Sequence, residues 1–141
     1  MSQKQKVLII DDEEDICRFT RSALEKTKRY EVIFATNALE GIALARDQLP
    51  GLILLDVNMP EMDGGDVAAS LASEESTRDI PLVFVTALIS KNEIGERPTS
   101  IGGHLFIAKP LTPKMLVERV DSILRVGQQP KQDEAAGVKN A

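Results

Sequence analysis

Short, largely apolar runs that alternate with amphipathic stretches constrain the fold of this chain most strongly. The runs are Val7–Ile10, Tyr30–Ala35, Leu52–Val57, Leu82–Val85 and Leu105–Ala108. Apolar residues recur at helical spacing between most of these runs and after the last one. Neighbouring parallel strands need such crossovers, and a strand that is apolar throughout has both faces covered. The pattern therefore predicts a doubly wound α/β domain with a five-stranded parallel sheet and helices on both faces.

Two segments fit this alternation less well. The segment Lys91–Gly103, before the fifth run, contains Pro98 and three glycines. Proline removes a backbone donor and clashes inside a helix, so we predict a short or irregular fourth helix here. Residues 127–141 are polar and lack apolar periodicity. We therefore expect one domain over residues 1–126, followed by a disordered polar tail.

Charge and cysteine content narrow the functional classes. The net charge of -5 argues against direct binding to nucleic acid, whose phosphates attract basic surfaces. The sequence contains no apolar run long enough to cross a bilayer, so membrane insertion is not expected. Cys17 is the single cysteine, which excludes an internal disulfide and a multi-cysteine zinc site. A cytoplasmic location fits these features best.

Polar residues stand where the predicted strands end. Asp11 and Asp12 follow the first run, Asp56 lies at the tip of the third, and Thr86 and Lys109 follow the fourth and fifth. The carboxyl ends of parallel strands share one edge of a sheet, so these side chains should meet there. Clustered carboxylates repel one another, and Mg²⁺ is an oxygen-seeking cation that relieves the repulsion and works beside phosphates. A carboxylate can also be a nucleophile that forms an aspartyl phosphate.

These residues carry a resemblance to a known family. The segments "DDEED", "LLDVNMPEMDG", "VTA" and "AKP" occur in this order, each at the end of a predicted strand. From Lys6 to about Val126 the chain resembles the receiver domain of two-component response regulators. The resemblance implies a flavodoxin-like strand order, 2-1-3-4-5. No DNA-binding output domain follows in this sequence, so a stand-alone, single-domain receiver is expected, or a receiver excised from a longer protein.

The resemblance also implies roles for the residues at the site. Asp56 would be the phosphoacceptor. Asp12 and Asp56 would bind Mg²⁺ or Mn²⁺ together with the backbone carbonyl of Asn58, and Asp11 would complete the acid pair through water. Lys109 would contact the phosphoryl oxygens.

A conformational switch and protein partners follow from the same resemblance. Thr86 would move toward the phosphoryl group and Phe106 would turn inward, and the bond from Lys109 to Pro110 would be cis. The phosphoryl donor would be a histidine kinase or a histidine phosphotransfer protein, and an unknown downstream protein would read the switch. The domain would not be a turnover enzyme, because it would only accept the phosphoryl group and slowly lose it.

Three alternatives stay open at this stage. Asp11 and Asp12 could cap the helix that follows them instead of binding metal. The chain could be a pseudo-receiver that binds partners without being phosphorylated. It could also be an aspartate-nucleophile phosphatase of the haloacid dehalogenase type, although Asn58 stands where that class places its second acid.

Overall fold

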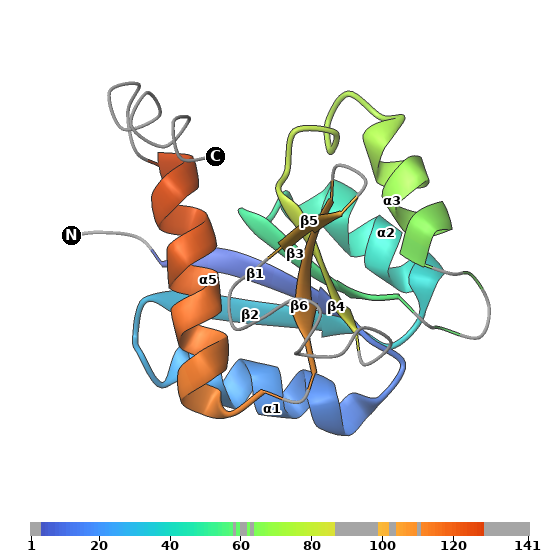
Figure 1. Ribbon diagram of the computed structural model, residues 1–141. Coiled ribbons are helices and arrows are strands. Elements are labelled where there is room, and N and C mark those ends of the chain that lie inside the picture. The colour runs from blue at the N-terminus through green and yellow to red at the C-terminus, as the bar shows by residue number, and fades with distance from the viewer. Residues whose placement is uncertain are drawn as a thin grey trace.

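The computed structural model describes residues 4–57, 59, 62, 64–86, 99–101, 104–109 and 111–128. Its helices are α1 (Glu14–Glu25), α2 (Ala38–Gln48), α3 (Gly64–Ala72) and α5 (Pro113–Gln128). Its strands are β1 (Gln5–Ile10), β2 (Tyr30–Ala35), β3 (Leu52–Asp56), β4 (Leu82–Thr86), β5 (Thr99–Ile101) and β6 (His104–Ala108). The five predicted strands are thus all present, and Figure 1 shows how the helices surround them.

The sheet has the order β2-β1-β3-β4-β6-β5. All pairs among β2, β1, β3, β4 and β6 are parallel, so the predicted order 2-1-3-4-5 of the five parallel strands is confirmed. Strand order reverses beside β1, because β2 lies on one side of it and β3 on the other. Ligands of such sheets bind outside the carboxyl ends of the strands near this point.

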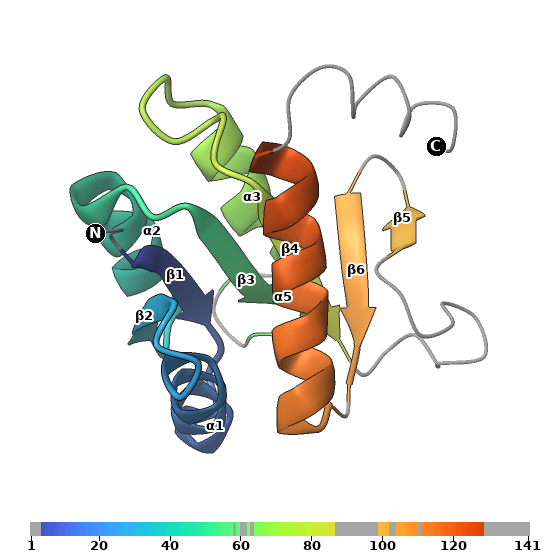
Figure 2. The same cartoon turned by 90° about the vertical axis from the view of Figure 1, so that its left-hand side faces the viewer.

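The edge of the sheet beyond β6 departs from the sequence prediction. The short strand β5 pairs antiparallel with β6, with Ile101 opposite His104, and it forms the last strand of the sheet (Figure 2). The sequence analysis expected only irregular or helical structure in this segment. The two residues between these strands in the sequence, Gly102 and Gly103, lie outside the described residues. The short or irregular helix was predicted within Lys91–Gly103; residues 91–98 of that segment lie outside the described part of the chain, and residues 99–101 form β5.

Two apolar cores lie on opposite faces of the sheet, as predicted. Figure 1 shows the helices that cover these faces. One core joins the sheet to α1 and α5 and includes Val7, Ile9, Cys17, Leu24, Leu54, Val85, Leu116 and Val120. The other joins it to α2 and α3 and includes Leu8, Ile10, Ile42, Ile53, Leu55, Val67, Leu71 and Phe84. Successive residues of a strand alternate between the two cores because strand side chains point to opposite faces.

Local sequence fixes where α2 begins and how closely it approaches the sheet. The Asn37 side chain accepts a hydrogen bond of 2.8 Å from the Glu40 N–H, a standard helix cap. A Cβ on Gly41 would lie 2.6 Å from Cδ1 of Ile10. Glycine at this position therefore lets α2 pack directly against β1.

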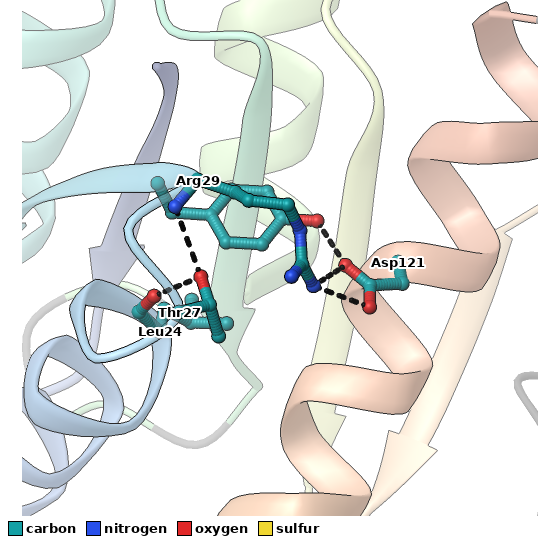
Figure 3. Close-up of polar contacts among 5 residues, drawn as sticks. Leu24, Thr27, Arg29 and Asp121 are labelled. Carbon is teal, nitrogen blue, oxygen red and sulfur yellow. Dashed lines mark hydrogen bonds and ion pairs between the residues drawn. The ribbon is translucent and has the colours of Figure 1, made fainter.

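A polar cluster joins the start of β2 to α5. Arg29 Nη2 donates to both carboxylate oxygens of Asp121, at 2.9 and 2.7 Å, and Figure 3 shows this ion pair. The Tyr30 hydroxyl donates to the same carboxylate. We call Arg29, Tyr30 and Asp121 the β2–α5 brace. It lies at the amino ends of the strands, where the Gln5 N–H also bonds to the Arg29 carbonyl at 3.0 Å.

Helix α5 runs to Gln128, whereas the sequence analysis placed the end of the domain at residue 126. The predicted disordered tail lies, from residue 129 onward, outside the described residues. No helix in the described ranges is both long enough and apolar enough to cross a membrane.

Candidate functional site

Four neighbouring strands place the polar residues of the site at one edge. Asp11 directly follows β1, Asp56 is the last residue of β3, Thr86 is the last residue of β4, and Lys109 directly follows β6. The strands are in register there: Asp56 lies opposite Val85 and Thr86 lies opposite Ala108. The sequence prediction that these strand ends converge is therefore confirmed.

The three carboxylates predicted from sequence form a compact cluster. One carboxylate oxygen from each of Asp11, Asp12 and Asp56 lies within 4.8 Å of the other two. Asp11 is fully buried and Asp56 is 7% exposed, whereas Asp12 faces solvent. We call these residues the acid cluster. Its burial makes mutual repulsion stronger than it would be on an open surface.

Lys109 bridges two members of the acid cluster. Its Nζ lies 3.1 Å from Oδ2 of Asp11 and 3.6 Å from Oδ1 of Asp56. Burial of Lys109 disfavours its charged form, but attraction and hydrogen bonding to Asp11, together with attraction to Asp56, outweigh burial and raise its pKa. The Lys109 N–H also donates to the Thr86 carbonyl at 2.9 Å, which fixes the start of the loop after β6 against β4.

Asp11 contacts both the start of α1 and Lys109 of the site. Its Oδ1 accepts a hydrogen bond of 2.9 Å from the Glu13 N–H at the start of α1, while Oδ2 accepts from Lys109. Below it, the buried Cys17 thiol donates to the Asp11 carbonyl at 3.4 Å. Burial, and then the charge of Asp11, raise the pKa of Cys17 to about 12, so the thiol stays protonated and belongs to the core.

The acid cluster fits a hard divalent cation. Three carboxylates and one ammonium group meet here, so these four residues together carry more negative than positive charge. All the candidate ligands are oxygens, the donors that Mg²⁺ and Mn²⁺ prefer. Asn58, whose backbone carbonyl was predicted as a further ligand, lies outside the described residues, as does Pro110.

The two predicted switch residues lie on neighbouring strands. Thr86 is 1% exposed at the end of β4. Phe106 is half-buried on β6, and its ring stacks on that of Phe84 with the centroids 5.0 Å apart and the planes at 29°. Phe84 and Phe106 are paired in the β4–β6 register, so both rings lie on the face covered by α2 and α3. The geometry places both residues near the site but does not test their predicted motion.

A glycine contributes to the site in a way that the sequence analysis did not foresee. The sequence analysis assigned no role to Gly64. This residue begins α3, and its N–H donates to the Val57 carbonyl at 2.9 Å. A Cβ on Gly64 would lie 2.9 Å from the Val57 Cα and 3.3 Å from the Asp56 carbonyl oxygen. Only glycine allows α3 to begin this close to the phosphoacceptor candidate. The Asp63-Gly64 pair in the motif was the available signal.

Comparison with known proteins gives one consistent family. The family model of the response regulator receiver domain matches residues 7–121. The polar-differentiation response regulator DivK of Brucella anthropi is 34% identical over 120 residues, which cover 85% of this chain and 96% of DivK. The probable transcriptional regulator ycf27 of Porphyra purpurea is 39% identical over 126 residues, covering 88% of this chain and 49% of that protein. The chain therefore spans about half the length of this ycf27 relative.

Solved structures agree with this assignment. The chemotaxis protein CheY4 of Vibrio cholerae superposes with a TM-score of 0.72 at 26% identity, covering 85% of this chain and 98% of CheY4. A CheY-like receiver domain protein of Methanospirillum hungatei gives a TM-score of 0.71 at 26% identity, covering 87% and 95%. With its strand order, its acid cluster and these relatives, the chain belongs to the family of response regulator receiver domains.

Proposed function

We propose that this domain accepts a phosphoryl group on Asp56 from a phosphohistidine of a partner protein. The observation that carries the proposal is the convergence of Asp11, Asp12 and Lys109 around Asp56 at the carboxyl edge of the sheet. A buried carboxylate ringed by two further acids is poorly placed for a purely structural role. It is well placed to attack phosphorus when a cation offsets the charge.

The proposed transfer is a single displacement at phosphorus. A carboxylate oxygen of Asp56 forms a bond to phosphorus while the bond between phosphorus and the histidine nitrogen breaks. The electron pair of the broken bond stays on the imidazole, and the product on Asp56 is an acyl phosphate. The Lys109 ammonium, 3.6 Å from Asp56, is placed to stabilise the negative charge on the transferred phosphoryl oxygens.

Among the described residues, Mg²⁺ or Mn²⁺ would be held by Asp12 and Asp56, with Asp11 as the partner acid. When bound, the ion supplies positive charge that offsets the carboxylates and the incoming phosphoryl oxygens. Asp11 contributes chiefly by positioning, because its two oxygens are already engaged by Lys109 and the Glu13 N–H.

The output of the domain is a change in packing at Thr86 and Phe106. The backbone of Thr86 is hydrogen-bonded to Lys109, and Lys109 also contacts Asp56. Phosphorylation of Asp56 therefore changes the contacts of Thr86 on β4 through Lys109. Phe106 has no hydroxyl and responds through its ring contact with Phe84. Replacing Phe106 with alanine should therefore remove most phosphorylation-linked chemical shift changes on β4 and β6 without preventing phosphorylation of Asp56.

The donor in this proposal is a histidine kinase or histidine phosphotransfer protein, and a downstream protein in the cytoplasm reads the switched surface. Catalytic turnover of phosphoesters is not part of the proposal, because Asn58 lacks the ionisable proton of a second catalytic acid.

Incubation with Mg²⁺ and acetyl phosphate, followed by intact-mass measurement, tests the proposal. We expect a mass increase of one phosphoryl group in the parent protein and none in Asp56→Asn. Beryllofluoride should give NMR shift changes around β3 and β4 in the parent alone. If neither reagent modifies the parent, the chain is a pseudo-receiver. Rapid repeated hydrolysis of phosphoesters would instead favour the phosphatase alternative.

A further inference from the structure

Phe84 contacts two parts of the domain that are far apart in the sequence. Its side chain is 4% exposed and belongs to the core shared with α2 and α3. Its ring stacks on that of Phe106, with the centroids 5.0 Å apart. The same ring meets Gly64, because a Cβ added to that glycine would lie 3.0 Å from Cε1 of Phe84. Phe84 therefore packs against both β6 and the first turn of α3.

The first turn of α3 is also held against the segment that carries Asp56. The Gly64 N–H donates to the Val57 carbonyl at 2.9 Å. A Cβ on Gly64 would lie 2.9 Å from the Cα of Val57 and 3.3 Å from the Asp56 carbonyl oxygen. Because these backbones are in close contact, a shift of the backbone at Asp56 or Val57 also shifts the start of α3.

The residues of this series of contacts differ in their freedom to move. Gly64 and Phe84 are buried, whereas Phe106 is half-buried on β6. A close-packed interior has few voids, so a buried ring that moves displaces its neighbours. Phe106 has solvent on part of its surface, and its ring has the most room to change position. A shift that begins at the backbone of Asp56 therefore has its largest effect on Phe106.

These contacts are distinct from the connection between the site and Thr86. Thr86 lies two residues beyond Phe84, so both side chains lie on the same face of β4. The connection to Thr86 begins at the Lys109 side chain, which contacts Asp56. The connection through Gly64 begins at the backbone that follows Asp56. Substitution of Phe84 therefore separates the two.

We propose that Gly64, Phe84 and Phe106 form a packing unit that couples the first turn of α3 to the Phe106 ring. Through this unit a change in the backbone at Asp56 moves α3 and Phe106 together, so phosphorylation changes α3 as well as β6. The coupling is a property of the packed core and exists before phosphorylation. Only its use in signalling rests on the proposed phosphoryl transfer.

Substitution of Phe106 in the unphosphorylated protein tests the coupling itself. We expect Phe106→Leu to shift the backbone amide resonances of Gly64 and Gly65, the first residues of α3. In a Phe84→Leu background the same substitution should shift those amides by about half as much or less. The direct ring-current effect of Phe106 on α3 is present in both backgrounds. The difference between the backgrounds therefore measures the contribution of Phe84.

Val83→Ala provides the matched control background. Val83 is the neighbour of Phe84 on β4, is fully buried, and belongs to the core on the opposite face of the sheet. In this background the response of Gly64 and Gly65 to Phe106→Leu should keep its parent size.

A second substitution guards against misfolding of Phe84→Leu, which circular dichroism detects. Phe84→Met keeps most of the apolar volume, but its flexible side chain presents no rigid face to α3 and β6. It should reduce the response of the α3 amides in the same way as Phe84→Leu.

Beryllofluoride with Mg²⁺ tests the use of the packing unit in signalling. In the parent protein we expect the ring resonances of Phe106 to shift together with the amides of Gly64 and Gly65. In Phe84→Leu the α3 amides next to Asp56 should still shift, whereas the response of the Phe106 ring should fall to about half or less. Val83→Ala should retain both responses.

Two results would overturn the packing unit. The first is a response of the Gly64 and Gly65 amides to Phe106→Leu that is equal in the parent and Phe84→Leu backgrounds, or absent from both. The second is a response of the Phe106 ring to beryllofluoride that keeps its parent size in Phe84→Leu. If beryllofluoride shifts no resonance of the parent, the proposed phosphoryl transfer fails, and the experiment on the unphosphorylated protein still decides whether the coupling exists.

Discussion

The acid cluster and the β2–α5 brace lie at opposite ends of the sheet and differ in how their charges are balanced. In the brace, the Asp121 carboxylate is matched by the Arg29 guanidinium and by the Tyr30 hydroxyl. In the acid cluster, three carboxylates lie close together, and the Lys109 ammonium contacts two of them, Asp11 and Asp56. Both groups tie together segments that are far apart in the sequence.

This difference separates a structural contact from a functional one. The charge of the brace carboxylate is already balanced within the protein. Removing the brace should therefore reduce stability and leave phosphorylation of Asp56 unaffected. The acid cluster carries excess negative charge, so its members should reduce stability until a cation or a phosphoryl group is present. The predictions below test this contrast, beginning with the largest expected effect.

Loss of the Lys109 charge should have the largest effect on function. Lys109→Met keeps much of the side-chain length but removes the donor next to Asp56, so phosphorylation by acetyl phosphate should slow by about 100-fold. Lys6→Met is the matched control, because Lys6 bonds to Gln48 away from the site. Time-resolved intact-mass measurement compares the rates, and equal rates for the two variants would contradict the role of Lys109.

Asp121→Asn should have the largest effect on stability without an effect on phosphorylation. The substitution removes the charge that Arg29 and Tyr30 both contact, and charged hydrogen bonds of this partly exposed kind contribute about 1–2 kcal/mol. Urea unfolding should show this loss in the free energy of unfolding. A phosphorylation rate that falls along with stability would show that the brace and the site are coupled.

Asp12→Asn should increase stability when divalent cations are removed, whereas Asp121→Asn should decrease it. Asp12 is exposed and lies within the acid cluster, so loss of its charge relieves repulsion from Asp11 and Asp56. We expect a gain of about 0.5–1 kcal/mol in the free energy of unfolding in the presence of EDTA. Destabilisation by this substitution would mean that the acid cluster is already balanced within the protein.

The contribution of the brace to stability should depend on pH, and this effect should be smaller than the preceding ones. Partial burial raises the pKa of Asp121, but hydrogen bonds from Tyr30 and Arg29 outweigh burial and hold the pKa below its usual value. A carboxyl group with a lowered pKa stabilises the fold above the unfolded value and loses this contribution as pH falls through the folded pKa. The stability difference between the parent and Asp121→Asn should therefore be constant near neutral pH and should shrink below about pH 4. A difference that persists in acid would point to packing instead of charge.

The sequence predicted the core of the site because strand ends are easy to locate. Asp11, Asp56 and Lys109 each adjoin an apolar run, and parallel pairing alone brings those run ends together. The family resemblance then supplied their roles. The fold followed from the same alternation of runs and amphipathic stretches.

Other features had no readable signal in the sequence. The strand β5 has three residues, too few to show a period, and its glycine neighbours were interpreted as a break in a helix. Arg29 and Asp121 are 92 positions apart, and polar surface residues have no periodicity that would pair them. The contact between Phe84 and Gly64 depends on how the side chains of the sheet fill the space beside α3, which spacing alone does not determine.

A Mg²⁺ titration followed by thermal unfolding tests the central claim most directly. The parent protein and Asp121→Asn should both show a saturable rise in Tm, because both keep the acid cluster intact. Asp12→Asn should show little or no rise, since it lacks a carboxylate predicted to hold the ion. If Mg²⁺ raises the Tm of all three proteins equally, or of none, the acid cluster does not form the divalent cation site on which this account depends.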